Sequence, residues 1–370
     1  MNDSTCKILQ IGNYPPPMCG WAIQLKMVTE ELRRRGHICD VLKINENRQV
    51  KSPNYVDVQN GWDYLTKIWH FARSGYRLNV HVNGMSKKGY ALAMAAVLVG
   101  RFLNRPALVT FHGGLSQDYF PRHDYSLPHW AFSALFRLAG SIACDSHPIQ
   151  DEIVKYGIRP EKVQSIPTFS PQYAQFAPVV LSEDIDKFLM QHTPVILSYV
   201  SFRAEYRLDV LREVMKLHKT QYPGAGFVWL GFPDKEVPLA KEYVRNWGAD
   251  EQNSLLLLGN LTHDEFLTLL SRCFLYLRTP ACDGVAASVL EAVSLGIPVV
   301  ASENGRRPKG VVTYRDTDAM DMAEKLRYVV EHFAEVHSGL EVEASTDNVS
   351  RMADWLADST PESCEKALAT

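Results

Sequence analysis

The chain has 370 residues, more than one hydrophobic core comfortably serves, so its length favours two domains. Hydrophobic residues make up 46% and charged residues 22%, as in an ordinary soluble globular protein, and a net charge of −3 gives no support for a nucleic-acid partner. Seven cysteines without a C-x-x-C pair argue against a disulfide framework or a zinc site and favour a reducing cytoplasm. The polar amino terminus and the lack of a long apolar run predict neither a signal peptide nor a membrane span.

In the first half of the chain, short runs rich in Val, Ile and Leu alternate with segments of helical periodicity, which is typical of parallel strands covered by helices. Helices are predicted at residues 22–35, ended by Gly36, and at 90–103. Strands are predicted at residues 7–11, 38–42, 79–82, 108–111, 141–144 and 163–166. This half therefore predicts one open α/β domain.

The segment at residues 169–193 carries several prolines and an acidic stretch at 183–186, and its start lacks periodicity, so it is the predicted linker. The alternating pattern then restarts, with strands predicted at residues 195–199, 226–230, 255–258, 274–277, 298–301 and 311–314, and helices at 317–336 and 348–356. The predicted domains are residues 1–178 and 179–345, followed by a C-terminal helix and tail at 346–370.

Two carboxylates, Asp283 and Glu291, bracket seven residues just before a predicted strand. Gly284, Ala286 and Ala287 are small enough to let a ligand approach the backbone, and the unpaired amides of a helix start favour an anion such as a diphosphate. Glu291, about a turn into the helix, can accept two hydrogen bonds from a ribose diol. The segment predicts a nucleotide diphosphate site, although an acid near a helix start also has a structural use, because it complements the helix dipole.

The same segment resembles the E-x7-E element of retaining GT-B glycosyltransferases of family four, with Asp283 in place of the first Glu. The similarity continues through residues 278–280 before it and 295–302 after it. It implies a GT-B fold, in which two Rossmann-like, doubly wound domains face an interdomain cleft and the last helix crosses back to the first domain. In that scheme Glu291 holds the ribose, Asp283 holds a donor-sugar hydroxyl, and the amides of residues 284–287, including that of Val285, hold the diphosphate.

Two further features follow predicted strands, where open α/β sheets bind their ligands. The proline-rich loop at residues 12–21 contains Gly20, which can bring backbone amides near a phosphate or sugar; the family usually has two glycines here, and Cys19 replaces the first. His112 precedes two glycines, and its imidazole can donate to a sugar hydroxyl or a phosphate oxygen. The resemblance implies that His112 lies against the donor sugar, while a rigid turn and a satisfied histidine are the structural alternatives.

The loop after the first strand of the second half departs from the family pattern. The family supplies Arg and Lys five residues apart to neutralise the leaving diphosphate, and Ser201 and Tyr206 occupy those positions here. Arg203 and Arg207 are close in sequence and can deliver the same charge, because a leaving dianion needs cationic donors where no metal is present. They are also compatible with exposed loop arginines.

Two more residues are expected in the donor site. Arg278 ends a predicted strand with a guanidinium that suits a phosphate, and Gly231, in the turn after residues 226–230, is expected to contact the nucleotide through its backbone. The D-x-D spacings at 184–186 and 316–318 lie in the predicted linker and at a predicted helix cap, so we predict no metal site, no cofactor and metal-independent activity.

Together these features predict a retaining glycosyltransferase of the hexosyltransferase type. It would move a sugar from a nucleotide-diphosphate sugar to a glycan, a lipid-linked sugar or another acceptor, in polysaccharide or glycoconjugate biosynthesis in the cytoplasm. The replaced basic residues and Asp283 leave a second interpretation open, a non-catalytic scaffold that binds a sugar nucleotide in a glycan assembly complex. Aromatic and basic residues at 62–77 leave open a peripheral contact with the inner face of a membrane, although most such helices pack on their own sheet.

Overall fold

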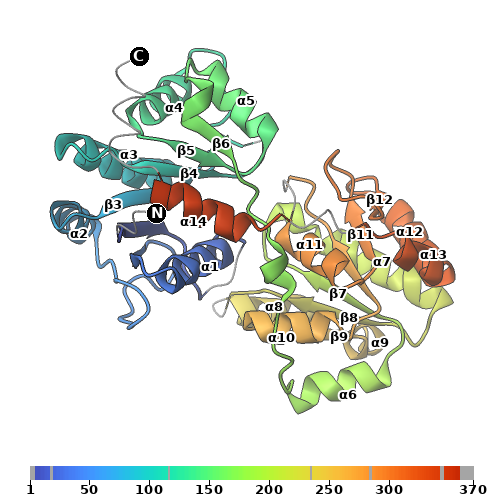
Figure 1. Cartoon of the computed structure of the whole chain (residues 1–370). Helices are drawn as coiled ribbons and strands as arrows, with labels where there is room; N and C mark the ends of the chain where they lie inside the picture. Colours follow the sequence, from blue (N-terminus) through green and yellow to red (C-terminus); the bar gives the residue numbers. More distant parts are fainter. Residues whose placement is uncertain are drawn as a thin grey trace. The chain divides into compact units, whose positions relative to one another are not determined.

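The computed structural model describes residues 5–16, 20–115, 117–233, 236–282, 286–341 and 346–358. These residues form two parallel sheets of six strands each (Figure 1). The first sheet has the order β2-β1-β3-β4-β5-β6 and consists of β1 (Lys7–Gly12), β2 (Ile38–Lys43), β3 (Arg77–Asn83), β4 (Leu108–His112), β5 (Ile142–Cys144) and β6 (Val163–Ser165). The second sheet has the order β12-β11-β10-β7-β8-β9 and consists of β7 (Val195–Tyr199), β8 (Gly226–Leu230), β9 (Leu255–Leu257), β10 (Leu275–Arg278), β11 (Val299–Ser302) and β12 (Val312–Tyr314).

Helices connect the strands of both sheets. With the first sheet these are α1 (Gly20–Arg34), α2 (Gly61–Arg73), α3 (Lys87–Phe102), α4 (Leu127–Leu138), α5 (His147–Lys155), η1 (Pro160–Lys162) and α14 (Asn348–Asp358). The remainder are η2 (Pro171–Ala174), α6 (Glu183–Gln191), η3 (Ala204–Tyr206), α7 (Leu208–Gln221), α8 (Val237–Val244), α9 (Ala249–Asn253), α10 (His263–Leu270), α11 (Ala287–Ser294), α12 (Ala319–Glu331) and α13 (Phe333–Ser338). None of the helices in the described part of the chain combines the length and the apolar composition needed to span a bilayer.

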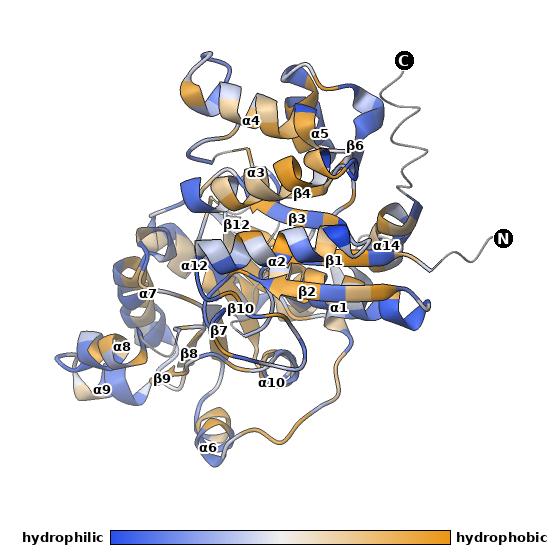
Figure 2. Cartoon of the chain, turned by 90° about the vertical axis from the view of Figure 1, so that its left-hand side faces the viewer, coloured by the Kyte–Doolittle hydropathy of each residue, from blue (hydrophilic) through white to orange (hydrophobic). Residues whose placement is uncertain are grey.

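The strands are apolar because a parallel sheet is covered on both faces. In β1, Ile8, Leu9 and Ile11 have no exposed surface, and hydrophobic colour runs along β2 and β4 in Figure 2. Connections between parallel strands are right-handed, so the direction in which a connection moves along the sheet decides which face its helix covers. Helices α2, α3 and α4 connect strands in one direction along the sheet and share one face. Helix α1 connects β1 to β2 in the other direction and covers the opposite face. At Gly12 a Cβ atom would lie 2.6 Å from Cδ1 of Leu25, so a glycine is needed where α1 crosses the end of β1.

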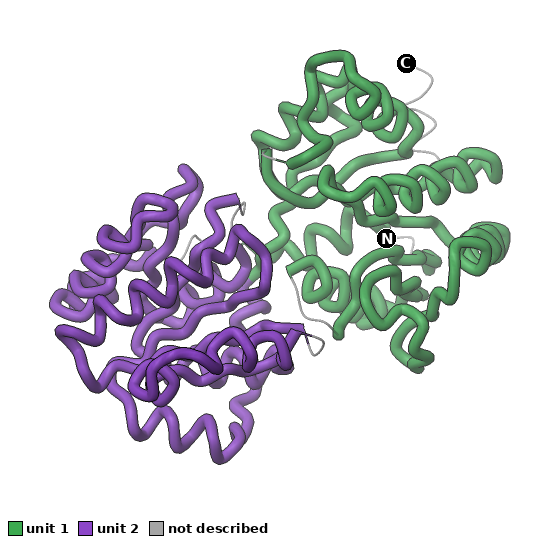
Figure 3. The backbone as a smooth tube through the Cα atoms, turned by 180° about the vertical axis from the view of Figure 1, so that it is seen from behind, with its two compact units in different colours: residues 1–170, 346–370 green, residues 171–345 purple. Residues whose placement is uncertain are grey.

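The chain divides into two compact units, residues 1–170 with 346–370 and residues 171–345 (Figure 3). The division lies at Ser170 and not near residue 178, because η2 contacts α11 and its Tyr173 is fully buried in the second unit. The predicted linker also contains α6, whose Ile185 and Phe188 are buried in a hydrophobic cluster of the second unit. The acidic stretch at its start is the first turn of a helix, where carboxylates complement the helix dipole.

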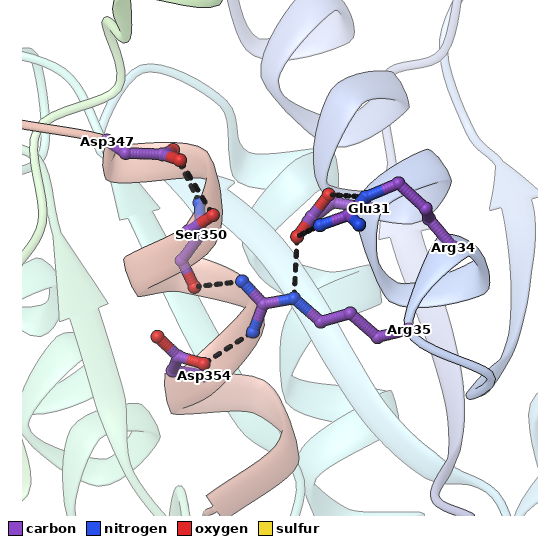
Figure 4. Close-up of polar contacts among 6 residues, drawn as sticks. All are labelled: Glu31, Arg34, Arg35, Asp347, Ser350 and Asp354. Atoms are coloured by element: carbon purple, nitrogen blue, oxygen red, sulfur yellow. Dashed lines mark hydrogen bonds and ion pairs between the residues drawn. The ribbon is translucent and has the colours of Figure 1, made fainter.

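Helix α14 belongs to the first unit and packs against α1 (Figure 4). Arg35 joins the two helices: its guanidinium pairs with Glu31 at 2.6 Å and with Asp354, and it donates to the carbonyl of Ser350. Beneath these polar contacts Leu356 is fully buried. The last described segment of the chain therefore completes one face of the first sheet.

The predicted α/β class with two Rossmann-like sheets is confirmed. Every predicted strand lies within two residues of an observed one, because most of them are runs of β-branched and other apolar residues that are buried in the sheet. The helix predicted at 317–336 is two helices, α12 and α13, since the backbone at His332 leaves the helical region with a φ of −120°.

His218 on α7 gives the second unit a pH-dependent stability. Its side chain is buried, and this burial lowers its pKa from 6.5 to about 4. Because the folded-state pKa is depressed, the unfolded chain binds a proton that the folded chain does not as the pH falls below about 6.5. Stability therefore falls between about pH 6.5 and pH 4, by up to about 3 kcal/mol.

Replacing His218 with Phe should remove this part of the acid sensitivity. Neither ring nitrogen of His218 has a hydrogen-bond partner among the described residues, and the ring stacks on Tyr222, so an apolar ring of similar size fits the site. Denaturant unfolding at neutral and mildly acidic pH measures the effect, with His332→Phe at an exposed position as the control. Equal loss of stability on acidification in wild type and His218→Phe would contradict the assignment.

Candidate functional site

Glu291 lies in α11, which follows β10 at the carboxyl edge of the second sheet. The helix begins after Ala286, whose extended backbone marks the N-cap, so Ala287 is the first helical residue and Glu291 lies one turn further on. The predicted ligand-binding residues Asp283, Gly284 and Val285 lie outside the described residues. The described part of the segment thus has the loop-to-helix geometry that the spacing predicts.

The Glu291 carboxylate is bound by His263. Oε1 of Glu291 lies 2.8 Å from Nε2 of His263, and the glutamate side chain is only 3% exposed. His263 is the first residue of α10, whose start is fixed by a capping box between Thr262 and Glu265. A buried carboxylate without a partner is strongly destabilising, so His263 accounts for the burial of Glu291 and fixes one of its oxygens.

The ring of Tyr206 brings two of the predicted arginines together. The guanidinium carbon lies 5.4 Å from the ring centroid for Arg278 and 5.5 Å for Arg203, within the range of cation–π attraction. Arg278 ends β10 and is largely buried, whereas the side chain of Arg203 is 64% exposed and lies 3.5 Å from Glu205. Because β7 and β10 are neighbours in the sheet, both cations lie at the same carboxyl edge.

Arg207 is placed differently from the prediction. It caps α7 in the left-handed region with a φ of 49°, and its Nη2 lies 3.2 Å from Oδ2 of Asp316. In this ion pair Asp316 balances the positive charge of Arg207, which we expected to face a diphosphate. The structure therefore groups Arg203 with Arg278, and not with Arg207.

The helix cap predicted at 316–318 is confirmed, since Asp318 accepts a hydrogen bond from the amide of Asp321 at the start of α12.

Gly231 follows β8 with a φ of 98°. A Cβ atom here would lie 2.4 Å from Cε1 of Tyr199, so only glycine fits both the backbone conformation and the space. Its amide donates to the carbonyl of Gly259 at 3.2 Å, which joins the turns after β8 and β9. The amide of Gly231 is therefore used within the protein, and a nucleotide contact at this residue would involve other backbone atoms.

In the first unit, His112 ends β4 and has no exposed surface. Its Nδ1 lies 3.2 Å from Oδ1 of Asp145 and its Nε2 lies 2.9 Å from Nδ1 of His81. Trp21, which follows Gly20 at the start of α1, stacks on the ring at 4.7 Å. Both nitrogens and one face of the ring are therefore occupied. We expected His112 to donate directly to a sugar, and this arrangement corrects that expectation, because no free donor is left on the ring.

The hydrogen-bonded chain continues through His81 to the centre of the sheet. Burial, followed by the nearby His112, holds the pKa of His81 well below its ordinary value, so His81 is neutral. When His112 donates from Nδ1 to Asp145, its Nε2 accepts from Nδ1 of His81, and Nε2 of His81 then lies 3.2 Å from the amide nitrogen of Asn79 and 3.0 Å from Oε1 of Gln10. Thr168 adds a 2.6 Å hydrogen bond to Asp145. The chain fixes the orientation of His112.

Sequence reasoning missed the residues that hold the predicted ones in place. His263, Asp145, His81 and Asp316 are each distant in sequence from their partners, and sequence reasoning gave none of them a role in the site. Glu236 is another: it accepts hydrogen bonds from Ser201 and from the amide of Phe202 and so anchors the loop after β7. Asp145 directly follows β5 and Asp316 lies shortly after β12, so their positions beyond strand ends could have marked them. No group of three or more His, Cys, Asp or Glu side chains in the described ranges could hold a metal ion.

Two doubly wound parallel sheets of this kind are those of the GT-B fold. The structure is similar to that of Anabaena Alr3699/HepE in complex with UDP, with a TM-score of 0.66 and 16% identity over 98% of this chain and 100% of that one. S. aureus MnaA in complex with UDP gives a TM-score of 0.67 and 14% identity over 95% of each chain. A putative UDP-N-acetylglucosamine 2-epimerase from Listeria monocytogenes gives 0.65 and 12% over 96% of each. At these identities the similarity shows the fold.

The sequence comparisons each cover half of the chain or less. Residues 20–169 match Glycosyltransferase Family 4, so the match lies in the first unit, whereas the motif at residues 283–291 lies in the second. One subunit of the Arabidopsis thaliana phosphatidylinositol N-acetylglucosaminyltransferase is 25% identical over 194 residues, which cover 50% of this chain and 41% of that protein, less than half of its length. The family match agrees with the resemblance to family four over residues 20–169, which are less than half of the chain.

Arg207 and Arg203 should behave differently when truncated. Arg207→Ala leaves the partly buried Asp316 without its partner and should destabilise the protein by about 1 to 3 kcal/mol. Arg203→Ala, at an exposed position, should change stability by less than about 0.5 kcal/mol. Chemical denaturation of the two variants makes the comparison, and an Arg207→Ala protein as stable as Arg203→Ala would show that the ion pair is not structural.

Proposed function

We propose that this protein is a retaining glycosyltransferase that transfers a hexose-type sugar from a nucleotide-diphosphate sugar to a glycan or lipid-linked acceptor. The observation that carries the proposal is Glu291, a buried carboxylate one turn into a helix at the carboxyl edge of a parallel sheet, with one oxygen fixed by His263. A ribose diol offers two donors to such a group. The match of residues 20–169 to Glycosyltransferase Family 4 supports the same function.

The donor would be held by the second unit. In this proposal Glu291 accepts from the ribose hydroxyls, Asp283 accepts from a hydroxyl of the donor sugar, and the amides of residues 284–287 bind the diphosphate at the start of α11. Arg278 and Arg203, grouped around Tyr206, supply the positive charge for the diphosphate. The acceptor would bind on the first unit near Gly20, where His81 and Asp145 hold His112 in place.

The reaction replaces one bond at the anomeric carbon by another. The bond between the anomeric carbon and the β-phosphate oxygen breaks, and its electron pair stays on the nucleoside diphosphate. The acceptor oxygen forms the new bond on the same face, and its proton passes to the leaving phosphate oxygen. Cationic side chains and helix amides that bind the diphosphate lower the barrier, because negative charge grows there in the transition state.

The comparisons support a uridine nucleotide as the first donor to test. Anabaena HepE is known in complex with UDP, UDP and glucose, and UDP-glucose, and the Neisseria meningitidis UDP-GlcNAc 2-epimerase in complex with UDP-GlcNAc. The Arabidopsis relative is by its name a phosphatidylinositol N-acetylglucosaminyltransferase subunit, which supports testing lipid acceptors and a role in glycoconjugate or polysaccharide biosynthesis.

We infer a reducing, cytoplasmic compartment, because the cysteines among the described residues are thiols that form no disulfide with one another.

Turnover of UDP-sugars tests the proposal and separates it from its rivals. We expect release of UDP in the presence of acceptor, and undiminished release in EDTA, because arginines and helix amides carry the charge of the leaving group. Loss of turnover in EDTA that manganese restores would refute metal independence. An epimerase would return the sugar still attached to UDP, and a scaffold would bind UDP-sugar without converting it. Either result would overturn the proposed activity.

Nucleotide affinity should depend on the Glu291 carboxylate. Glu291→Gln keeps the volume but loses charge-assisted acceptance from the diol, which should weaken UDP binding by about 1.5 to 3 kcal/mol. His263→Ala, which frees the carboxylate from its partner, should weaken binding by a smaller amount. Calorimetry measures both, with Glu335→Gln at an exposed position of α13 as the matched control. Unchanged UDP affinity in Glu291→Gln would show that the ribose binds elsewhere.

A further inference from the structure

The helix layer formed by α2, α3 and α4 exposes large apolar side chains to solvent. Trp62 and Phe102 are each 75% exposed, Leu127 is 82% exposed and Trp130 is 53% exposed. We call the surface formed by Trp62, Trp69, Leu98, Phe102, Leu127 and Trp130 the α2–α4 apolar face. Isolated exposed apolar residues need no explanation, but a group on three adjacent helices does.

These side chains lie on neighbouring helices, because α2, α3 and α4 lie side by side and run in the same direction. The hydroxyl of Tyr64 on α2 donates to the carbonyl of Leu92 on α3, and the rings of Trp69 and Phe102 are 5.4 Å apart further along the same two helices. Arg101, near the end of α3, donates to the carbonyl of Leu138 at the end of α4. In Figure 2 all three helices lie on the side turned toward the viewer.

The charges of this layer are strongly asymmetric. Helices α2, α3 and α4 contain six Lys and Arg residues and one acid, Asp63, a net charge of +5. Asp63 is already paired with Lys67 at 2.8 Å. The exposed cations lie near the helix ends: Lys87 and Lys88 open α3, Arg73 closes α2, and Arg137 lies in the last turn of α4.

The opposite layer of the same unit is a natural comparison. Helices α1 and α14 carry four basic and four acidic residues, a net charge of zero, and none of their described large apolar side chains is exposed. The whole chain has a net charge of −3. Apolar exposure and positive charge therefore occur together on the α2–α4 apolar face and are absent from the described residues of the layer behind it.

We propose that the α2–α4 apolar face binds the surface of a membrane that contains anionic lipids. Tryptophan, phenylalanine and leucine side chains enter the boundary between headgroups and acyl chains, and the flanking Lys and Arg side chains meet the lipid phosphates. A second copy of the chain fits the surface less well, because a two-fold symmetric contact would place two faces of charge +5 against each other. The proposal stands independently of the donor and of catalysis.

Co-sedimentation of the full chain with lipid vesicles tests the proposal. We expect the wild type to bind vesicles of phosphatidylcholine with phosphatidylglycerol, to bind phosphatidylcholine alone much more weakly, and to lose binding as salt is raised. Trp62→Ser with Phe102→Ser, and separately Arg73→Glu with Lys88→Glu, should each lower the partition constant by about tenfold or more. All four residues are exposed, and thermal unfolding checks that the variants remain folded.

Matched controls come from the second unit. Leu239→Ser with Met320→Ser removes two exposed apolar residues there, and Lys241→Glu reverses one exposed charge on α8, so both should leave vesicle binding unchanged. The proposal is wrong if the wild type stays in the supernatant with both vesicle types, or if the α2 and α3 variants bind as well as the wild type. A dimer in solution that Trp62→Ser converts to a monomer would assign the face to a second copy and would likewise overturn it.

Discussion

A parallel sheet is covered by helices on both faces, so a ligand can reach its strands only at their ends. Both sheets of this protein obey this constraint: most of their buried strand residues are apolar, and the candidate site residues lie where strands stop or in the segments that follow. In the second unit Arg278 ends β10 and Glu291 lies in the helix that follows it. In the first unit His112 ends β4. The positions of the candidate site residues follow from this constraint before any chemistry is considered.

Burial then requires that each polar group at these edges has a partner. Glu291 meets His263 in the second unit, and Asp145 meets His112 in the first, so each unit holds a carboxylate with an imidazole. Such contacts stabilise an otherwise costly buried charge and also fix the orientation of the carboxylate. The ion pair of Arg207 with Asp316 follows the same logic, which explains why an arginine expected at the ligand serves the protein itself.

The sequence was sufficient where the signal is local. Buried apolar runs marked the strands, and the spacing of Asp283 and Glu291 located the helix that carries Glu291, because neighbouring residues set both features. It was insufficient where two distant segments meet. His263 lies 28 residues from Glu291, and Asp316 lies 109 residues from Arg207, so no local pattern announces either pair. Helix α6 was hidden for another reason: it is short, and its acidic first turn resembles a solvated linker.

The central claim is that the second unit binds a nucleoside diphosphate through Glu291. A crystal structure of the protein with UDP tests it most directly. The account predicts both ribose hydroxyls within hydrogen-bond distance of the Glu291 carboxylate, with Oε1 still near His263, and the diphosphate at the start of α11 beside Arg278. A UDP molecule bound elsewhere, with Glu291 contacting only His263, would contradict it.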